Sequence, residues 1–153
     1  AAATPALGAG LALARVGCFL AGCCGGLPTS LPWGVVFSPG SPAHIQQVLS
    51  SPTLFPAGPL PVHPTQLYEA AAALSGAGLA ARLLARRARP GVACTAFALW
   101  FTAVRWGIFY LRPQPEADGL MPFFQPALYA LTLLVGVLAY IHLDRPARDH
   151  WVP

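Results

Sequence analysis

The chain has 153 residues, of which 56% are hydrophobic and only 9% are charged. A soluble domain usually carries about 25% charged residues, so this composition, with a mean hydropathy of +0.57, argues against a soluble domain and indicates a single membrane domain over residues 1–153. The net charge of +4 comes from arginines alone, which are not gathered with aromatic residues on one basic surface, so we expect no nucleic-acid partner.

The first apolar segment covers residues 6–22 and is rich in alanine and glycine. Small residues are typical of a membrane helix that packs closely against its neighbours. The chain begins with Ala1 and carries no basic residue before this segment, so no signal peptide is evident. We therefore expect a fragment of a longer protein whose upstream helices are absent.

A long proline-rich stretch follows at residues 27–63, without any Arg, Lys, Asp or Glu. Its eight prolines argue against a continuous helix. We expect a loop outside the membrane. Its apolar residues, among them Trp33 and Phe55, leave two interpretations open: a structured periplasmic-type loop, or a surface that contacts lipid or substrate.

Three further apolar segments cover residues 64–87, 91–111 and 124–142. Each of the four segments is near the roughly 20 residues that a helix needs to cross a bilayer. The predicted fold is therefore an all-α integral membrane protein, a polytopic bundle of about four transmembrane helices with a proline-rich outer loop.

The arginines decide the predicted orientation. One cluster lies between the second and third segments, a pair follows the fourth segment, and the proline-rich loop has none; the residues are Arg82, Arg86, Arg87, Arg89, Arg145 and Arg148. The positive-inside rule places both clusters in the cytoplasm and the proline-rich loop on the outer side.

This topology brings three charged side chains to a similar depth in the outer half of the membrane. Arg15 and Arg105 each lie about 10 Å below the outer end of their helices, and Glu69 lies roughly 7 Å inside the second helix. Because a charge in lipid is costly without a partner, we expect the three to face one another. The surplus positive charge favours an anionic ligand such as a phosphate, which guanidinium groups bind with forked donors. A plain buried ion pair is the alternative.

The second helix opens with His63-Pro64-Thr65-Gln66-Leu67-Tyr68-Glu69, which is unusually rich in polar side chains. One interpretation is the polar wall of a headgroup site. The other is helix capping together with an interfacial tyrosine.

Three cysteines, Cys18, Cys23 and Cys24, follow Arg15 closely. A structural zinc site needs four ligands; Cys94 falls about a membrane thickness away, which leaves His63 as the fourth candidate. We expect the cysteines to be small packing residues, with no metal and no cofactor. A thiol-redox role and a metal site are the alternatives.

Taken together, these motifs resemble the prolipoprotein diacylglyceryl transferase family. The heptapeptide that begins at His63 is the most specific match. The other matching stretches are Arg15-Val16-Gly17-Cys18-Phe19 with Gly22 and Gly26, Pro32-Trp33-Gly34-Val35, Arg105 and Arg112 with Pro115-Glu116, and Phe124-Gln125. The resemblance covers nearly the whole chain and corresponds to the C-terminal part of the family's chain.

The resemblance implies a multi-pass enzyme of the bacterial inner membrane, surrounded by membrane lipids. It would move diacylglyceryl from phosphatidylglycerol to the lipobox cysteine thiol of a prolipoprotein signal peptide, on the outer side. Arg15 and Arg105 are the implied catalytic residues, which would stabilise charge on the leaving phosphate. His63 is the candidate base, unless His44 folds back from the loop. The implied substrate-binding residues are Arg15, Gly17, Gly22, Gly26, Gln66, Tyr68, Glu69 and Arg112.

The chain also departs from the family at several polar positions. Ala14 stands for glycine, Cys18 and Ala21 for asparagine, Cys23 and Phe109 for glutamate, and Phe101 for tyrosine. The family's His-Gly-Gly-Leu stretch would lie upstream of this chain. Two alternative functions follow: a non-catalytic membrane paralogue that binds phospholipid or lipopeptide, and a membrane thiol-redox protein.

Overall fold

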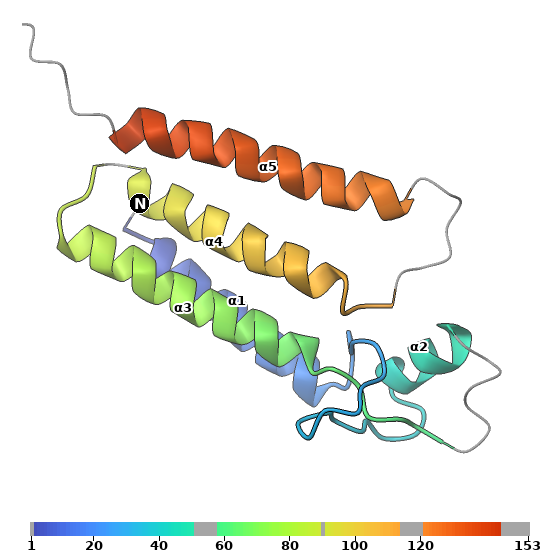
Figure 1. Cartoon of the computed structure of the whole chain (residues 1–153). Coiled ribbons are helices and arrows are strands. Elements are labelled where there is room, and N and C mark those ends of the chain that lie inside the picture. The colour runs from blue at the N-terminus through green and yellow to red at the C-terminus, as the bar shows by residue number, and fades with distance from the viewer. Residues whose placement is uncertain (1, 51–57, 90, 114–120, 145–153) are drawn as a thin grey trace, which may run out of the picture.

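The computed structural model describes residues 2–50, 58–89, 91–113 and 121–144 (Figure 1). Within these ranges the fold is all-α, as predicted, and no strand occurs; two isolated bridges join Val62 to Pro28 and to Val35. The helices are α1 (Thr4–Leu20), α2 (Pro42–Ser50), α3 (Thr65–Ala85), α4 (Val92–Phe109) and α5 (Met121–Asp144).

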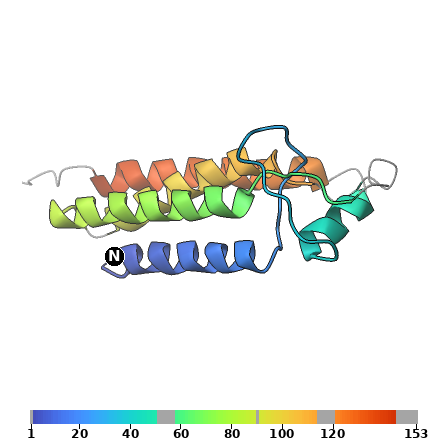
Figure 2. The ribbon, with the colours of Figure 1, turned by 90° about the horizontal axis from the view of Figure 1, so that it is seen from below.

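The four long helices correspond to the four predicted apolar segments, with ends that differ by one to three residues. They run in alternating directions, and α3, α4 and α5 form one layer in chain order (Figure 1). Helix α1 lies outside this layer, against α3 (Figure 2). Helix α2 and the proline-rich segment cover one end of the bundle, where α1 and α4 end and α3 begins.

The contact between α1 and α3 explains the small residues of the first segment. Gly8 and Ala12 are buried on α1, one helical turn apart on the same face. A Cβ atom at Gly8 would lie 2.8 Å from the Cβ of Ala77 and 3.1 Å from the carbonyl oxygen of Ala73. Glycine therefore lets the two backbones approach closely, which is the usual way in which membrane helices gain contact without a hydrophobic driving force.

The proline-rich segment is more structured than predicted. Its nine-residue helix α2 begins at Pro42, a position that proline favours because the first helical N–H has no intrahelical partner. The Gln47 side chain bonds the backbone of Leu60 twice, donating from Nε2 and accepting at Oε1, each at 3.2 Å. Phe37, Ala43 and Val62 form a small core below it. The expectation of a loop throughout residues 27–63 was therefore incomplete.

Within the described part of the chain, two helices are long and apolar enough to cross a membrane: α4, and residues Phe124–Leu143 of α5, with mean hydropathies of 1.5 and 1.8. Helix α1 is apolar but has 17 residues. Length and composition therefore support two spans, and the four predicted spans stay a prediction. Pro115-Glu116, Arg145 and Arg148 lie outside the described residues.

Candidate functional site

The most distinctive feature of the structure is a cluster of three arginines on one buried carboxylate. Glu69 is 1% exposed. Its Oε2 lies 2.6 Å from Arg15 Nε, and its Oε1 lies 2.5 Å from Arg105 Nη1 and 3.2 Å from Arg112 Nη2. The expected meeting of Arg15, Glu69 and Arg105 is confirmed, and Arg112 joins them. We call these four residues the arginine cluster.

Three helices supply the arginine cluster. Glu69 lies one turn after Thr65 and one turn before Ala73 on the buried face of α3. Arg15 comes from α1 and Arg105 from α4, while Arg112 follows the end of α4. The carbonyl oxygen of Leu111 accepts a bond from the backbone N–H of Leu27 at 2.8 Å, so the segment that carries Arg112 is tied to the loop after α1.

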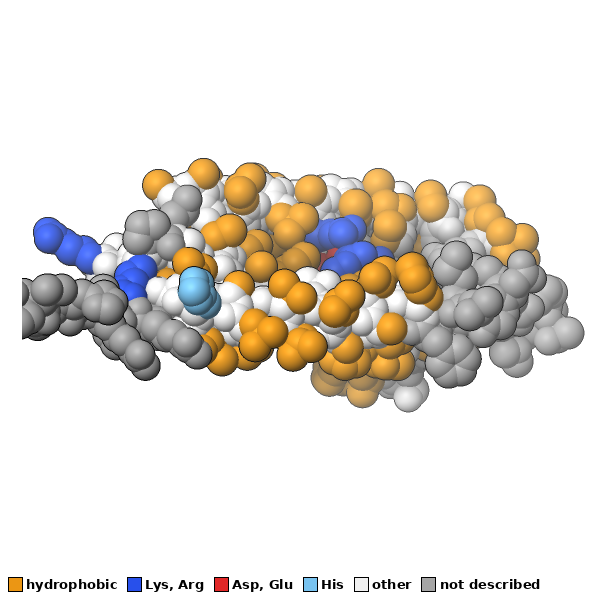
Figure 3. Space-filling model, turned by 90° about the horizontal axis from the view of Figure 1, so that it is seen from above, with side chains coloured by type: hydrophobic (Ala, Val, Ile, Leu, Met, Phe, Trp, Pro, Cys, Tyr) orange, Lys and Arg blue, Asp and Glu red, His pale blue; other side chains and the backbone are white. Residues whose placement is uncertain are grey.

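The arginine cluster has a surplus of positive charge. Three guanidinium groups share one carboxylate, so these four side chains carry a formal charge of +2. The side chains of the three arginines are 20% to 32% exposed. In Figure 3 a group of basic side chains around an acidic one lies within a largely hydrophobic face, apart from the basic side chains at the other end of the molecule. Such an arrangement suits an anion that approaches from the surface.

A cavity of 190 Å³ opens beside the arginine cluster, between the end of α4 and the start of α5. Gln125 and Tyr129, two polar residues one turn apart on α5, also line it. Sequence reasoning did not place them in the site, although their spacing puts both on one face of a helix. The described residues that line it are Glu69, Arg105, Ile108, Phe109, Arg112, Pro113, Gln125 and Tyr129.

Of the heptapeptide that opens α3, only Glu69 lines this cavity. Thr65 Oγ1 donates to the carbonyl oxygen of Cys24 at 2.9 Å, and Gln66 Nε2 donates to that of Cys23. Both side chains are fully buried. They therefore attach α3 to the loop after α1, while substrate binding by Gln66 stays a prediction.

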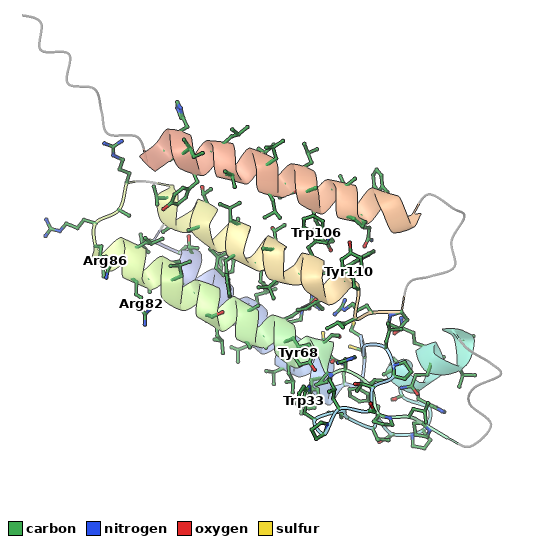
Figure 4. All side chains as sticks on the ribbon, in the orientation of Figure 1. Trp33, Tyr68, Arg82, Arg86, Trp106 and Tyr110 are labelled. Carbon is green, nitrogen blue, oxygen red and sulfur yellow. The ribbon has the colours of Figure 1, made fainter. Side chains whose placement is uncertain are left out.

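Tyr68 lies on another side of α3, beside Trp33 (Figure 4). Trp33 Nε1 donates to the Tyr68 hydroxyl at 2.8 Å, and His63 Nδ1 lies 3.3 Å from the same oxygen. Neither His63 nor Tyr68 lines the cavity. His44 Nδ1 accepts a bond from the backbone N–H of Gly40 at 3.1 Å. Catalysis by His63 is thus an untested prediction.

The predicted glycines differ in what surrounds them. A Cβ atom at Gly26 would lie 2.7 Å from the carbonyl oxygen of Leu111 and 2.8 Å from the side chains of His63 and Thr65. Gly22 has a φ of +62°, a left-handed conformation that glycine adopts easily. A Cβ at Gly17 would meet nothing within 4 Å. Gly22 and Gly26 thus have structural reasons to be glycine, and the substrate-binding role of all three stays a prediction.

The cysteines after Arg15 lie together. The sulfur atoms of Cys18, Cys23 and Cys24 all lie within 4.8 Å of one another, and the thiols are free. Cys23 Sγ donates to the carbonyl oxygen of Cys18 at 3.3 Å. Cys23 lies beyond the end of α1. Desolvation by burial raises the pKa of its thiol to about 11, and the neighbouring thiols contribute a smaller part of this increase. The expected packing role suits the partly buried Cys18 and Cys23 better than the exposed Cys24.

Two phenylalanines stand where the family resemblance implies polar residues. Phe101 packs against the buried alanines of α1 and α3 and stacks on Phe97, with ring centroids 6.0 Å apart. Phe109 is buried, lines the cavity, and meets the Tyr129 ring edge-on at 6.2 Å. Apolar packing thus takes the place of two polar groups, one of them at the cavity wall.

Comparison with known proteins finds relatives over most of the chain. The family model described as prolipoprotein diacylglyceryl transferase matches residues 1–143. A phosphatidylglycerol–prolipoprotein diacylglyceryl transferase of Clostridium tetani is 28% identical over 133 residues, 86% of this chain and 47% of the relative. A protein of the same name from Geobacter sulfurreducens is 33% identical over 148 residues, 92% of this chain and 49% of the relative. The chain spans about half the length of the curated relatives it matches. No solved structure matches it significantly.

Proposed function

The chain belongs to the prolipoprotein diacylglyceryl transferase family, and we propose that it supplies the phosphate-binding site of such an enzyme. The reaction would move diacylglyceryl from phosphatidylglycerol to the lipobox cysteine thiol of a prolipoprotein. The observation that carries this proposal is the arginine cluster: one arginine of α1, one of α4 and one just after α4 meet on Glu69 beside a cavity.

The proposed reaction requires positive charge beside the leaving phosphate, which the arginine cluster would supply. The thiol sulfur bonds to the glycerol carbon, the bond from this carbon to the phosphate oxygen breaks, and glycerol phosphate leaves while the thiol proton passes to a base. Negative charge grows on the leaving phosphate. Arg105 and Arg112 line the cavity, which supports the proposal that their guanidinium groups stabilise that charge as fixed donors.

The proposed setting is the bacterial inner membrane, crossed by four helices of a single domain, with the site toward the outer side. Arg82 and Arg86 lie at the far end of α3 from Tyr68 and Trp33 (Figure 4). Thirteen residues separate Arg82 from Glu69 along α3, a rise of roughly 20 Å. Basic residues at one end and aromatic residues at the other match the positive-inside rule and the aromatic belt.

A second candidate function is a family member that binds phospholipid without turnover. Phe109 occupies the cavity wall, and no histidine of the described residues lines the cavity. Arginines suffice to bind a phosphate, whereas transfer also needs a group that makes the thiol a thiolate. The two candidates therefore differ in turnover and agree in binding.

Lipidation by the full-length protein tests the proposal. A strain depleted of its own transferase would carry the wild type, Arg15→Ala or Arg105→Ala, with the remote Arg82→Ala and Arg86→Ala as matched controls. We expect the wild type and both controls to restore lipidation of a prolipoprotein, and the two cluster variants to lose it. A wild type that binds phosphatidylglycerol but restores no lipidation would support the second candidate. Full activity of Arg105→Ala would contradict both.

A further inference from the structure

We propose that Cys18, Cys23 and Cys24 form a three-coordinate site for a soft monovalent cation of the copper(I) class. Their sulfur atoms lie within 4.8 Å of one another at the end of α1, and all three side chains keep some exposure. This proposal is independent of the proposed transferase function.

The end of α1 brings two of these thiols together. The backbone N–H of Cys23 donates to the carbonyl oxygen of Cys18 at 3.1 Å, and that of Gly22 donates to Phe19 at 3.0 Å. With the left-handed Gly22, these bonds make a Schellman motif, in which the side chains at the positions of Cys18 and Cys23 commonly touch. An apolar pair is usual there, so this pair alone would point to packing.

The third thiol is what packing does not explain. Cys24 has a φ of +59°, a left-handed conformation that costs a residue other than glycine of order 1–3 kcal/mol. The residue is exposed, so it gains little burial in return. Buried groups of α3 hold the turn in place, because Thr65 and Gln66 donate to the carbonyl oxygens of Cys24 and Cys23. The turn thus fixes a third sulfur beside the first two.

The type and number of the ligand atoms favour copper(I) over zinc. Thiolates are soft ligands, which favour copper(I) and zinc. Zinc in a structural site takes four ligands, but the group of potential metal ligands found among the described residues holds only these three. Copper(I) binds three thiols with release of three protons, so the bound site carries a charge of −2. Arg15 lies one turn before Cys18 on α1 and belongs to the positive arginine cluster, which favours this charge.

Titration with copper(I) tests the site. The full chain in detergent micelles would be fully reduced, kept without oxygen, and titrated with copper(I) in competition with a coloured copper(I) chelator. We expect one equivalent per chain. Cys18→Ser, Cys23→Ser and Cys24→Ser should each weaken binding by tenfold or more, while Cys94→Ser, on α4, should bind as the wild type does. X-ray absorption of the loaded protein should show three sulfur neighbours and no nitrogen.

Several results would overturn the proposal. One is a wild type that binds no more copper(I) than the triple serine variant. Another is a Cys24→Ser variant that binds as tightly as the wild type, since Cys24 is the exposed third ligand whose replacement leaves the core packing intact. Circular dichroism of each variant would verify that the helices are retained. A fourth ligand in the absorption spectrum would contradict the three-coordinate geometry. Tighter binding of zinc than of copper(I) would contradict the choice of a soft monovalent cation.

Discussion

Replacing Glu69 by glutamine removes the carboxylate that three arginines share, with little change in shape. Charges about 4 Å apart interact with about 4 kcal/mol at an effective dielectric constant near 20, so three such attractions are lost and the repulsion among the arginines remains. Removal of one partner from a buried ion pair costs about 3–5 kcal/mol in measured cases. Because Glu69 is 1% exposed and its partners are only partly so, we expect a loss near 4 kcal/mol.

Thermal unfolding of the full chain in detergent micelles without anionic lipid would measure this loss. At roughly 2–4 °C per kcal/mol for a chain of this size, the Tm of Glu69→Gln should fall by about 8–16 °C. Phosphatidylglycerol should raise the Tm of Glu69→Gln more than that of the wild type, because its phosphate replaces the missing carboxylate among the arginines.

A double variant provides the control. Arg105→Gln combined with Glu69→Gln removes one of the three repelling cations, so it should be more stable than the sum of the two single losses predicts. Arg82→Gln, remote from the arginine cluster, should add to Glu69→Gln without such recovery. An unchanged Tm for Glu69→Gln, or equal stabilisation of both proteins by phosphatidylglycerol, would refute the view that the carboxylate holds a cationic anion site together.

Three further predictions concern the surroundings of the arginine cluster. Gly26→Ala places a Cβ 2.7 Å from a backbone carbonyl oxygen, so it should destabilise the protein by about 1–3 kcal/mol in thermal unfolding. Gly10 has open space around it, so Gly10→Ala should not destabilise the protein. Equal Tm values for the two variants would contradict this prediction. Tyr68→Phe removes the bond from Trp33 and should cost about 1 kcal/mol yet leave phosphatidylglycerol binding unchanged in a vesicle assay, and a large loss of binding would place Tyr68 in the site. Alkylation of Cys23, followed by peptide mass mapping, should accelerate about tenfold per pH unit until its raised pKa of about 11, because only the thiolate reacts; a plateau near the ordinary thiol value of about 8.5 would contradict its burial.

The sequence predicted the long helices and the central ion pairs for one physical reason. A bilayer requires about 20 apolar residues per span, which makes the segments visible, and it makes lone charges costly, which brings Arg15, Glu69 and Arg105 together. Gln125 and Tyr129 carry no charge, so the cost of burying a charge does not single them out. Sequence reasoning therefore did not place them in the cavity wall.

Two other differences have local causes. Helix α2 occupies the stretch from Pro42 to Ser50, which has proline only at its first position, so the overall proline content of the segment concealed it. A single polar wall was one of two interpretations of the heptapeptide, yet neighbouring residues on a helix point about 100° apart. Thr65 and Gln66 therefore reach the loop after α1, Tyr68 reaches Trp33, and only Glu69 reaches the arginines.

The formal charge of the arginine cluster bears on whether the site binds a lipid or releases a product. The phosphodiester of phosphatidylglycerol carries one negative charge, but the glycerol phosphate that would leave carries about 1.5 to 2 at neutral pH. The four side chains of the arginine cluster carry +2. This charge matches the charge of the leaving glycerol phosphate, and the charge that develops during its departure, better than the single charge of the lipid. Groups that bind the changing charge more strongly than the starting one accelerate a reaction. We therefore expect glycerol phosphate to displace phosphatidylglycerol more effectively than glycerophosphoglycerol, a diester with the same headgroup, in equilibrium competition. Equal displacement by the two would indicate a site built for binding alone.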